Sequence, residues 1–260
     1  MRCFLDLSYD GSAYHGWQRQ PESISVQQVL EEKLSSLLGA PTVVVGCGRT
    51  DTGVHASAFY AHFDWDGPFT DRFADWKQAA WKLNGMLPPD IGVRRIFEVE
   101  DRAHARFDAQ ERAYAYHVHS WKDPFLEGRS ARVYQELDVE AMNRACEALV
   151  FKGDFAAFCK AGGGQKTTIC DVRLAEWTVV DEHRYRFDVV ADRFLRNMVR
   201  ATVGTLLDVG KGKIAPSDLP AILAAKDRSA AGKSALGCGL YLTRVTYPDY
   251  VFSPVGVKYL

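Results

Sequence analysis

The chain has 260 residues, of which 47% are hydrophobic and 25% charged, and its formal net charge at pH 7 is −1. These values are typical of an ordered globular protein with a buried core, and they argue against a disordered chain and a strongly basic nucleic-acid binder. The sequence has no run of about eighteen apolar residues, so no membrane-spanning helix is expected.

The first hundred residues alternate between short apolar runs and amphipathic stripes, which predict strands and helices. Strands are expected at residues 2–9, 42–47, 55–65 and 91–99. Helices are expected at 25–38, where Ser25 and Gln28 suggest a capping box and Gly39 an end, and at 71–83, which Asn84-Gly85 should stop. The predicted order is therefore β-α-β-β-α-β.

The rest of the chain repeats this order. Strands are expected at residues 113–120, 170–180, 185–191 and 241–247, and helices at 139–149, 196–209 and 217–225. The sequence thus predicts an α+β protein of two ferredoxin-like halves, residues 1–105 and 106–260, whose mixed and mostly antiparallel sheets flank a central RNA-binding cleft.

Residues 48–56, Gly-Arg-Thr-Asp-Thr-Gly-Val-His-Ala, stand between two β-branched or aromatic runs. Glycine, threonine and aspartate favour turns, so this segment is predicted to be a loop that presents the carboxylate of Asp51. Asp-Thr-Gly alone is also common in tight turns, where the aspartate only caps backbone amides. The alternative chemical role is that of a nucleophile or general base.

This string resembles the active-site motif of the TruA-type tRNA pseudouridine synthases, usually Gly-Arg-Thr-Asp-(Ala or Ser)-Gly-Val-His, with Thr52 at the small position. The resemblance extends over about residues 2–248. It includes an N-terminal motif at 9–20, Asn-x-x-Leu-Pro-x-Asp-Ile at 84–91, His-Ala-Arg-Phe at 104–107, Arg-x-Tyr-x-Tyr at 112–116, Phe-Leu-Arg-Asn-Met-Val-Arg at 194–200 and Gly-Leu-Tyr-Leu at 239–242. It is weakest at 231–238, where the family usually reads Ala-Gly-x-Thr-Ala-Pro-Ala.

The resemblance implies an isomerase that turns uridine into pseudouridine at positions 38, 39 and 40 of the tRNA anticodon stem-loop. Such chemistry breaks the N1–C1′ bond, rotates the base and rejoins it through C5, with no cofactor and no metal. Asp51 would attack C1′ or assist C2′ deprotonation, and both routes stay open, as does the base that removes the C5 proton. The family is usually a homodimer.

The resemblance also assigns three binding residues. Arg200 would pair with Asp51 and keep it ionised, since burial raises a carboxylate pKa. Tyr114 would stack on the extruded uracil, and Arg49 would enter the RNA stem. Each residue also has a plainer alternative. Arg200 could be a surface arginine that shares a helix face with Arg196, and Tyr114 a core residue that shares a strand face with Tyr116. Arg49 could form a salt bridge within the protein.

Two rival functions remain: a non-catalytic RNA-binding protein, and a metal-dependent hydrolase using Asp51 and His55. The second lacks a third ligand nearby, so His55 is expected to be structural. The six cysteines form no CxxC pair, and the acidic start at Asp6 does not suit a signal peptide, so a cytoplasmic protein with reduced thiols is expected.

Several basic clusters offer sites for phosphate groups despite the net charge of −1. They are Arg102/Arg106/Arg112, Arg129/Arg132, Lys160/Lys166 and Arg193/Arg196/Arg200. Each of the first three is expected to be solvated surface when taken alone.

Overall fold

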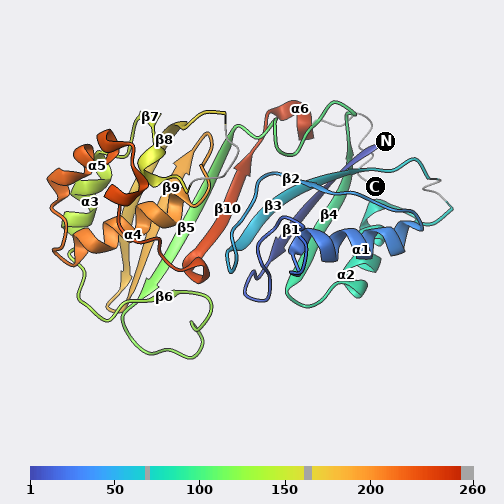
Figure 1. Ribbon diagram of the computed structural model, residues 1–260. Coiled ribbons are helices and arrows are strands. Elements are labelled where there is room, and N and C mark those ends of the chain that lie inside the picture. Colours follow the sequence, from blue (N-terminus) through green and yellow to red (C-terminus); the bar gives the residue numbers. More distant parts are fainter. Residues whose placement is uncertain (68–70, 161–165, 253–260) are drawn as a thin grey trace. The chain divides into compact units, whose positions relative to one another are not determined.

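The computed structural model describes residues 1–67, 71–160 and 166–252 and has an α+β fold (Figure 1). The chain divides into two compact units. The first comprises Met1–Gln110 and the described residues from Leu242 onward, and the second comprises Glu111–Tyr241. Strand β10 (Leu240–Thr246) crosses this boundary, whereas the predicted halves kept the last strand wholly in the second. Among the described residues, no helix is long and apolar enough to cross a membrane.

The first unit has the predicted β-α-β-β-α-β order. Its elements are β1 (Arg2–Tyr9), α1 (Val26–Leu38), β2 (Val45–Gly46), β3 (His55–Asp64), α2 (Trp76–Met86) and β4 (Ile91–Val99), followed after the second unit by the short α6 (Asp249–Phe252). The strands lie in the order β4-β1-β3-β2, and every neighbouring pair is antiparallel. Helices α1 and α2 pack against each other, as Figure 1 shows.

Helix α1 begins and ends as the sequence predicts. The Ser25 hydroxyl oxygen accepts the backbone N–H of Gln28 at 3.2 Å, and Gly39 ends the helix in the left-handed region with φ of 72°. The reciprocal half of the capping box is absent because the Gln28 side chain donates to Glu32 instead, at 3.0 Å. The apolar stripe faces the core, where Trp17 stacks on Phe59 with ring centroids 4.1 Å apart.

The predicted strand at 42–47 is too long, because the strand that pairs with β3 is Val45–Gly46, followed by one bond from the Cys47 N–H to the Tyr60 carbonyl at 2.7 Å. Side chains of α1 take the backbone amides that a longer strand would use. The N–H of Thr42 donates to the Ser35 hydroxyl at 2.9 Å, and the N–H of Val44 donates to the Glu31 carboxylate at 3.1 Å. The segment is therefore tied to the helix rather than to the sheet.

The predicted helix at 71–83 is shifted. Its N-cap is Asp75, whose carboxylate accepts the Gln78 N–H at 2.7 Å, and the helix continues through Asn84-Gly85 to Met86. Asn84 does not end the helix, because its side chain bonds the backbone of Val93. Its Nδ2 donates to the Val93 carbonyl at 2.6 Å, and its Oδ1 accepts the Val93 N–H at 2.8 Å. This pair of bonds joins α2 to β4.

The second unit is built around a hairpin that the sequence predicts. Its elements are β5 (Glu111–His119), β6 (Ala131–Arg132), α3 (Val139–Glu147), β7 (Lys152–Asp154), β8 (Ile169–Asp181), β9 (Arg184–Ala191), α4 (Met198–Gly210) and α5 (Leu219–Ala225). Strands β5-β9-β8-β7 are antiparallel neighbours, and the short β6 pairs with β5 in parallel. The two-residue β6 and three-residue β7 are too short to be read from sequence periodicity.

Helix α4 starts two residues later than predicted. Asn197, just before it, adopts a left-handed backbone with φ of 64°, so Arg196 lies outside the helix. The prediction that Arg196 and Arg200 share a helix face is therefore wrong. Almost every residue of α4 is buried, including Thr202 and Thr205, which places the helix in the core of the unit.

Candidate active site

The loop that carries Asp51 connects β2 to β3 and is held by the N-terminal motif. The Thr50 hydroxyl lies 2.9 Å from the Tyr9 hydroxyl, and the Thr50 carbonyl accepts the Trp17 N–H at 3.2 Å. On the other side of Asp51, the Gly53 N–H donates to the Tyr14 carbonyl at 3.3 Å. These contacts explain why both motifs occur in one sequence: residues 9–17 form the support of the loop.

Two glycines of the N-terminal motif allow this close approach. A Cβ atom on Gly16 would stand 2.3 Å from the Thr50 carbonyl oxygen, and Gly16 also has φ of 87°. A Cβ on Gly11 would stand 2.1 Å from the Val54 carbonyl oxygen. The backbone on each side of Asp51 is thus fixed by direct contact, as a reactive carboxylate requires.

The side chains of the loop differ in exposure. Asp51 is half-buried, and its carbonyl accepts the Val54 N–H at 3.2 Å, which closes the turn. Arg49 is exposed, and its side chain makes no hydrogen bond or ion pair with the residues that the structure describes. The internal salt bridge considered for Arg49 is therefore not formed within the described part of the chain.

His55, at the end of the Asp51 loop, connects this loop to the N-terminal motif. Its ring is 2% exposed, and its Nδ1 accepts the Gly11 N–H at 3.1 Å while the Asp10 carboxylate lies 3.1 Å from the same nitrogen. These two contacts tie His55 to the N-terminal motif and give the ring a structural role. No three His, Cys, Asp or Glu side chains of the described ranges are grouped as metal ligands.

Tyr114 and Tyr116 share one face of β5 but differ in environment. Tyr116 is fully buried opposite Phe187, its hydroxyl donates to the Leu236 carbonyl at 2.9 Å, and burial raises its pKa. Tyr114 is half-buried, and its ring meets Phe194 edge-on with centroids 5.1 Å apart. Tyr116 is thus a core residue. The Tyr114 ring is partly accessible and is held in place by its contact with Phe194.

Arg200 is the third residue of α4 and is half-buried. Its Nε donates to the Ala235 carbonyl at 2.8 Å, and its own carbonyl accepts the Ala235 N–H at 2.8 Å. This contact could not be predicted from the sequence, because it falls in the 231–238 stretch where the family resemblance is weakest. Asp51 and Arg49 belong to the first unit and Tyr114 and Arg200 to the second, so the ion pair between Asp51 and Arg200 stays a prediction.

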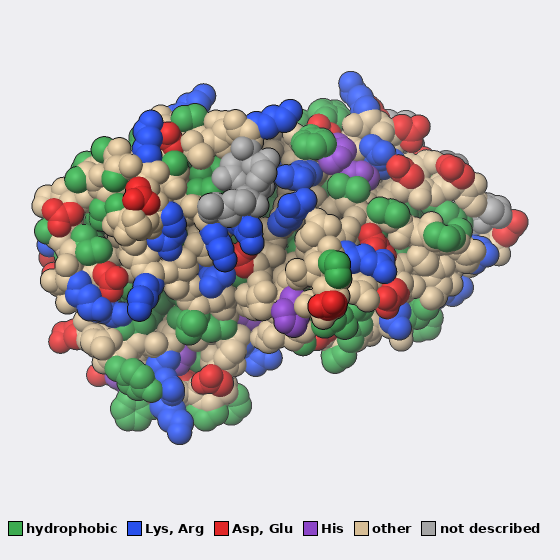
Figure 2. Space-filling view, viewed as in Figure 1, with side chains coloured by type: hydrophobic (Ala, Val, Ile, Leu, Met, Phe, Trp, Pro, Cys, Tyr) green, Lys and Arg blue, Asp and Glu red, His purple; other side chains and the backbone are tan. Residues whose placement is uncertain are grey.

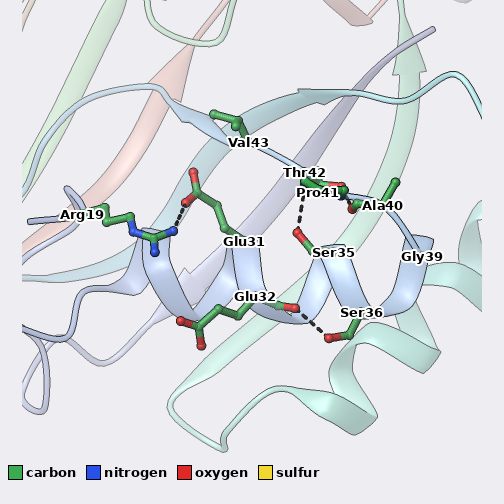
Figure 3. A pocket seen from close by; sticks show the side chains of 10 residues that line it. All are labelled: Arg19, Glu31, Glu32, Ser35, Ser36, Gly39, Ala40, Pro41, Thr42 and Val43. Carbon is green, nitrogen blue, oxygen red and sulfur yellow. Dashed lines mark hydrogen bonds and ion pairs between the residues drawn. The ribbon is translucent and has the colours of Figure 1, made fainter.

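A hollow of about 630 Å³, whose lining residues do not include Asp51, lies between α1 and the segment after it (Figure 3). Glu31 lies at its edge, but this carboxylate already accepts from Arg19 at 3.2 Å, from Gln27 at 3.1 Å and from the Val44 N–H. Other lining groups bond each other, such as Ser35 with Thr42 and Ser36 with Glu32. The polar groups that line the hollow thus already have hydrogen-bond partners within the protein, so we interpret it as a surface groove and not as a second reaction site.

Charges of both signs are spread over each unit on the face shown in Figure 2, in agreement with the net charge of −1. Several arginines of the predicted basic clusters are used within the protein. Arg102 pairs with Glu100 at 2.5 Å, and Arg112 donates to the Asp192 carbonyl at 2.9 Å. The guanidinium of Arg132 lies over the Tyr134 ring, 5.0 Å from its centroid. These contacts leave the arginines less available for phosphate than the sequence suggests.

Comparison with known proteins identifies relatives of this chain. The family profile described as tRNA pseudouridine synthase matches residues 145–248. A protein of Bacteroides fragilis named tRNA pseudouridine synthase A is 46% identical over 96% of this chain and 98% of its own length. Proteins of the same name from Bacteroides thetaiotaomicron and Parabacteroides distasonis are 47% and 46% identical, over 97% and 96% of this chain and 93% and 98% of theirs. The chain therefore belongs to the tRNA pseudouridine synthase A family.

Proposed function

We propose that this protein converts uridine to pseudouridine in the tRNA anticodon stem-loop, at positions 38, 39 and 40. The observation that carries the proposal is the half-buried Asp51 on a loop fixed on both sides by backbone hydrogen bonds to Tyr14 and Trp17. The family membership supplies the reaction, and this support supplies the rigidity that the reaction needs.

Asp51 starts the reaction in one of two ways. It attacks C1′ and forms a covalent sugar ester as the C1′–N1 bond breaks, or it removes the C2′ proton to give a glycal. After the detached uracil rotates, C5 displaces the Asp51 carboxylate from C1′ in the first route. In the second route C5 bonds to C1′ of the glycal while C2′ regains its proton. In both routes the C5 proton then leaves, and N1 ends protonated. The balance is an isomerisation, so the chemistry calls for no oxidant, cofactor or metal.

The other three residues bind the substrate. Arg49, exposed beside Asp51 with no described partner, enters the RNA stem and stabilises the nucleotide turned out of it. Tyr114 stacks on the uracil, in keeping with its partly accessible ring. Arg200 pairs with Asp51 and holds the carboxylate ionised, as the family resemblance implies.

We further propose that each unit is a ferredoxin-like half. In a split β-α-β fold, β1 lies between β3 and β4, and the first unit has the order β4-β1-β3-β2. The neighbours β5-β9-β8 in the second unit repeat the 1-3-2 part of this order. A homodimer in the cytoplasm completes the proposal, since tRNA is modified there and is long enough to span two subunits.

One assay separates this function from its rivals. tRNA carrying tritium at C5 of uridine releases tritium when pseudouridine forms, so the protein should release it with and without EDTA, once polyamine keeps the tRNA folded. A non-catalytic RNA-binding protein would bind tRNA and release none. A metal-dependent hydrolase using Asp51 and His55 would lose its activity in EDTA and recover it with zinc.

A further inference from the structure

The segment from Gly232 to Leu236, here the 232–236 segment, runs along helix α4 and touches it repeatedly. The Gly232 N–H donates to the Thr205 hydroxyl at 2.9 Å. Three residues later, Ala235 exchanges two bonds with Arg200, one with its backbone carbonyl and one with its side-chain Nε, both at 2.8 Å. Arg200 is thus held by the same residue at both ends.

The approach to the helix is as close as the backbone permits. A Cβ atom on Gly204 would stand 1.7 Å from the Lys233 carbonyl oxygen, and one on Gly232 would stand 2.9 Å from the Thr205 Cα. Only glycine at these positions lets the two backbones pack directly. The position of the Ala235 carbonyl is consequently set by the path of the whole segment.

Ser234 fixes this path through two further hydrogen bonds. Its hydroxyl oxygen accepts the Asn197 side-chain amide at 2.7 Å and an Nη of Arg228 at 2.8 Å. Arg228 also donates to the Gly232 carbonyl at 3.0 Å, and Asn197 stands at the N-terminus of α4. One hydroxyl therefore joins the segment to the start of the helix that carries Arg200.

We propose that Ser234 is a positioning residue for Arg200 in the isomerisation. The proposal rests on the role assigned to Arg200 under the proposed function. With Nε engaged by Ala235, a carboxylate that binds the guanidinium in a bidentate manner must use the two Nη groups. Ser234 fixes the carbonyl that holds Nε, so it sets the direction in which those Nη groups point.

The departure of residues 231–238 from the usual family sequence leaves the contacts of the 232–236 segment intact. Ser234 stands where the family usually has threonine and keeps the hydroxyl. The contacts made by Ala235 and Leu236 use only their backbone carbonyl and N–H groups, which do not depend on the side chain at 236. The Ser234→Thr variant should therefore preserve the arrangement, and Ser234→Ala should lose it.

The test measures kcat and KM for pseudouridine formation on unmodified tRNA, together with the thermal midpoint, for four variants. They are Ser234→Ala, Ser234→Thr, Arg200→Lys and the double variant Ser234→Ala/Arg200→Lys. Ser229→Ala is the matched control, because the Ser229 hydroxyl donates to Asp227 and makes no hydrogen bond to the 232–236 segment within the described part of the chain. Wild-type activity in the same assay tests the proposed function separately.

We expect Ser234→Ala to fold and to lose at least about tenfold in kcat, with KM within about twofold of wild type, because a misplaced group slows chemistry more than binding. Ser234→Thr and Ser229→Ala should keep the wild-type rate. In the Arg200→Lys background, which has no Nε, Ser234→Ala should add no further loss. Three results would overturn the proposal: an unchanged kcat, an equal loss in both backgrounds, or a Ser234→Ala protein that does not fold.

Discussion

Tyr114 and Tyr116 are two residues apart on β5, and their environments lead to opposite expectations. Base–aromatic stacking is worth about 1–3 kcal/mol, so Tyr114→Phe should keep much of the activity and Tyr114→Ala little. If the hydroxyl moves the C5 proton, Tyr114→Phe should be nearly as inactive as Tyr114→Ala. Single-turnover tritium release distinguishes these results, and an active Tyr114→Ala would exclude stacking.

Tyr116→Phe is the matched control for that series. It removes the hydrogen bond to the Leu236 carbonyl from a fully buried site, so it should cost about 1 kcal/mol of unfolding free energy. Because Leu236 belongs to the 232–236 segment that touches Arg200, kcat should also fall, but by less than in Tyr114→Ala. Urea denaturation measures the first quantity and the tritium assay the second. A stably folded Tyr116→Phe that loses as much activity as Tyr114→Ala would mean that the wrong tyrosine of β5 has been assigned to the base.

Arg200 makes a second prediction at the residue scale. Arg200→Ala should abolish most pseudouridine formation and lower the thermal midpoint, because it removes the bond from Nε to Ala235 as well as the cation. Arg200→Lys keeps the charge and should retain more activity. Activity at the wild-type level in Arg200→Ala would show that another cation holds the catalytic carboxylate ionised.

At the scale of elements, the N-terminal motif and the Asp51 loop form one unit of structure. Gly16→Ala combines a left-handed φ of 87° with a contact of 2.3 Å to the Thr50 carbonyl, so it should cost at least about 1–2 kcal/mol and displace the loop. Both the thermal midpoint and kcat should fall.

Gly85→Ala is the matched control for Gly16→Ala. Gly85 lies within α2 with no atom within 4 Å of an added Cβ, so alanine there should raise stability by up to about 1 kcal/mol and leave the rate unchanged. Differential scanning calorimetry and initial rates give both quantities. A Gly16→Ala protein as stable and active as wild type would contradict the close packing of the two loops.

His62 on β3 makes stability depend on pH. Burial, reinforced by the positive charge of Arg2, lowers its pKa to about 4, and its neutral Nδ1 accepts the Ala105 N–H at 3.1 Å. In the unfolded chain the pKa is about 6.5, so between these values the unfolded state binds more protons. Stability should therefore fall as the pH decreases from 6.5 towards 4.

Thermal midpoints measured between pH 4.5 and 7.5 test this dependence. His62→Gln keeps an acceptor for the Ala105 N–H and does not titrate, so it should flatten part of the slope. His183→Gln, at an exposed site, should leave the slope unchanged. A slope as steep in His62→Gln as in wild type would assign the effect to other groups, such as the neighbouring His104, whose pKa burial also lowers.

The elements were largely predictable because each has its own periodicity and caps. Element lengths were predicted wrongly where a side chain forms a hydrogen bond with a backbone group. Glu31 and Ser35 shorten the strand at 42–47, and Asn84 carries α2 past an expected stop. Such bonds join residues far apart in the sequence, so local propensity does not reveal them.

At the scale of the whole molecule, the site could be predicted only in part. Eight ordered motif positions predict Asp51 as the site carboxylate, and the support of its loop by residues 9–17 becomes visible only in the fold. The bond between Arg200 and Ala235 could not be foreseen, because it depends on a backbone carbonyl in a loop whose sequence departs from the family. The pairing of Asp51 with Arg200 across two units stays a prediction that the variants above test.

The central claim is that one carboxylate, Asp51, performs the isomerisation in tRNA. The most direct measurement is the pseudouridine content of tRNA after incubation with Asp51→Asn, alongside the Kd of that variant for the same tRNA. The control is Asp66→Asn, whose side chain is 98% exposed. We expect Asp51→Asn to bind tRNA and to form no pseudouridine, while Asp66→Asn behaves as wild type. Pseudouridine formation by Asp51→Asn within about tenfold of the wild-type rate would contradict it.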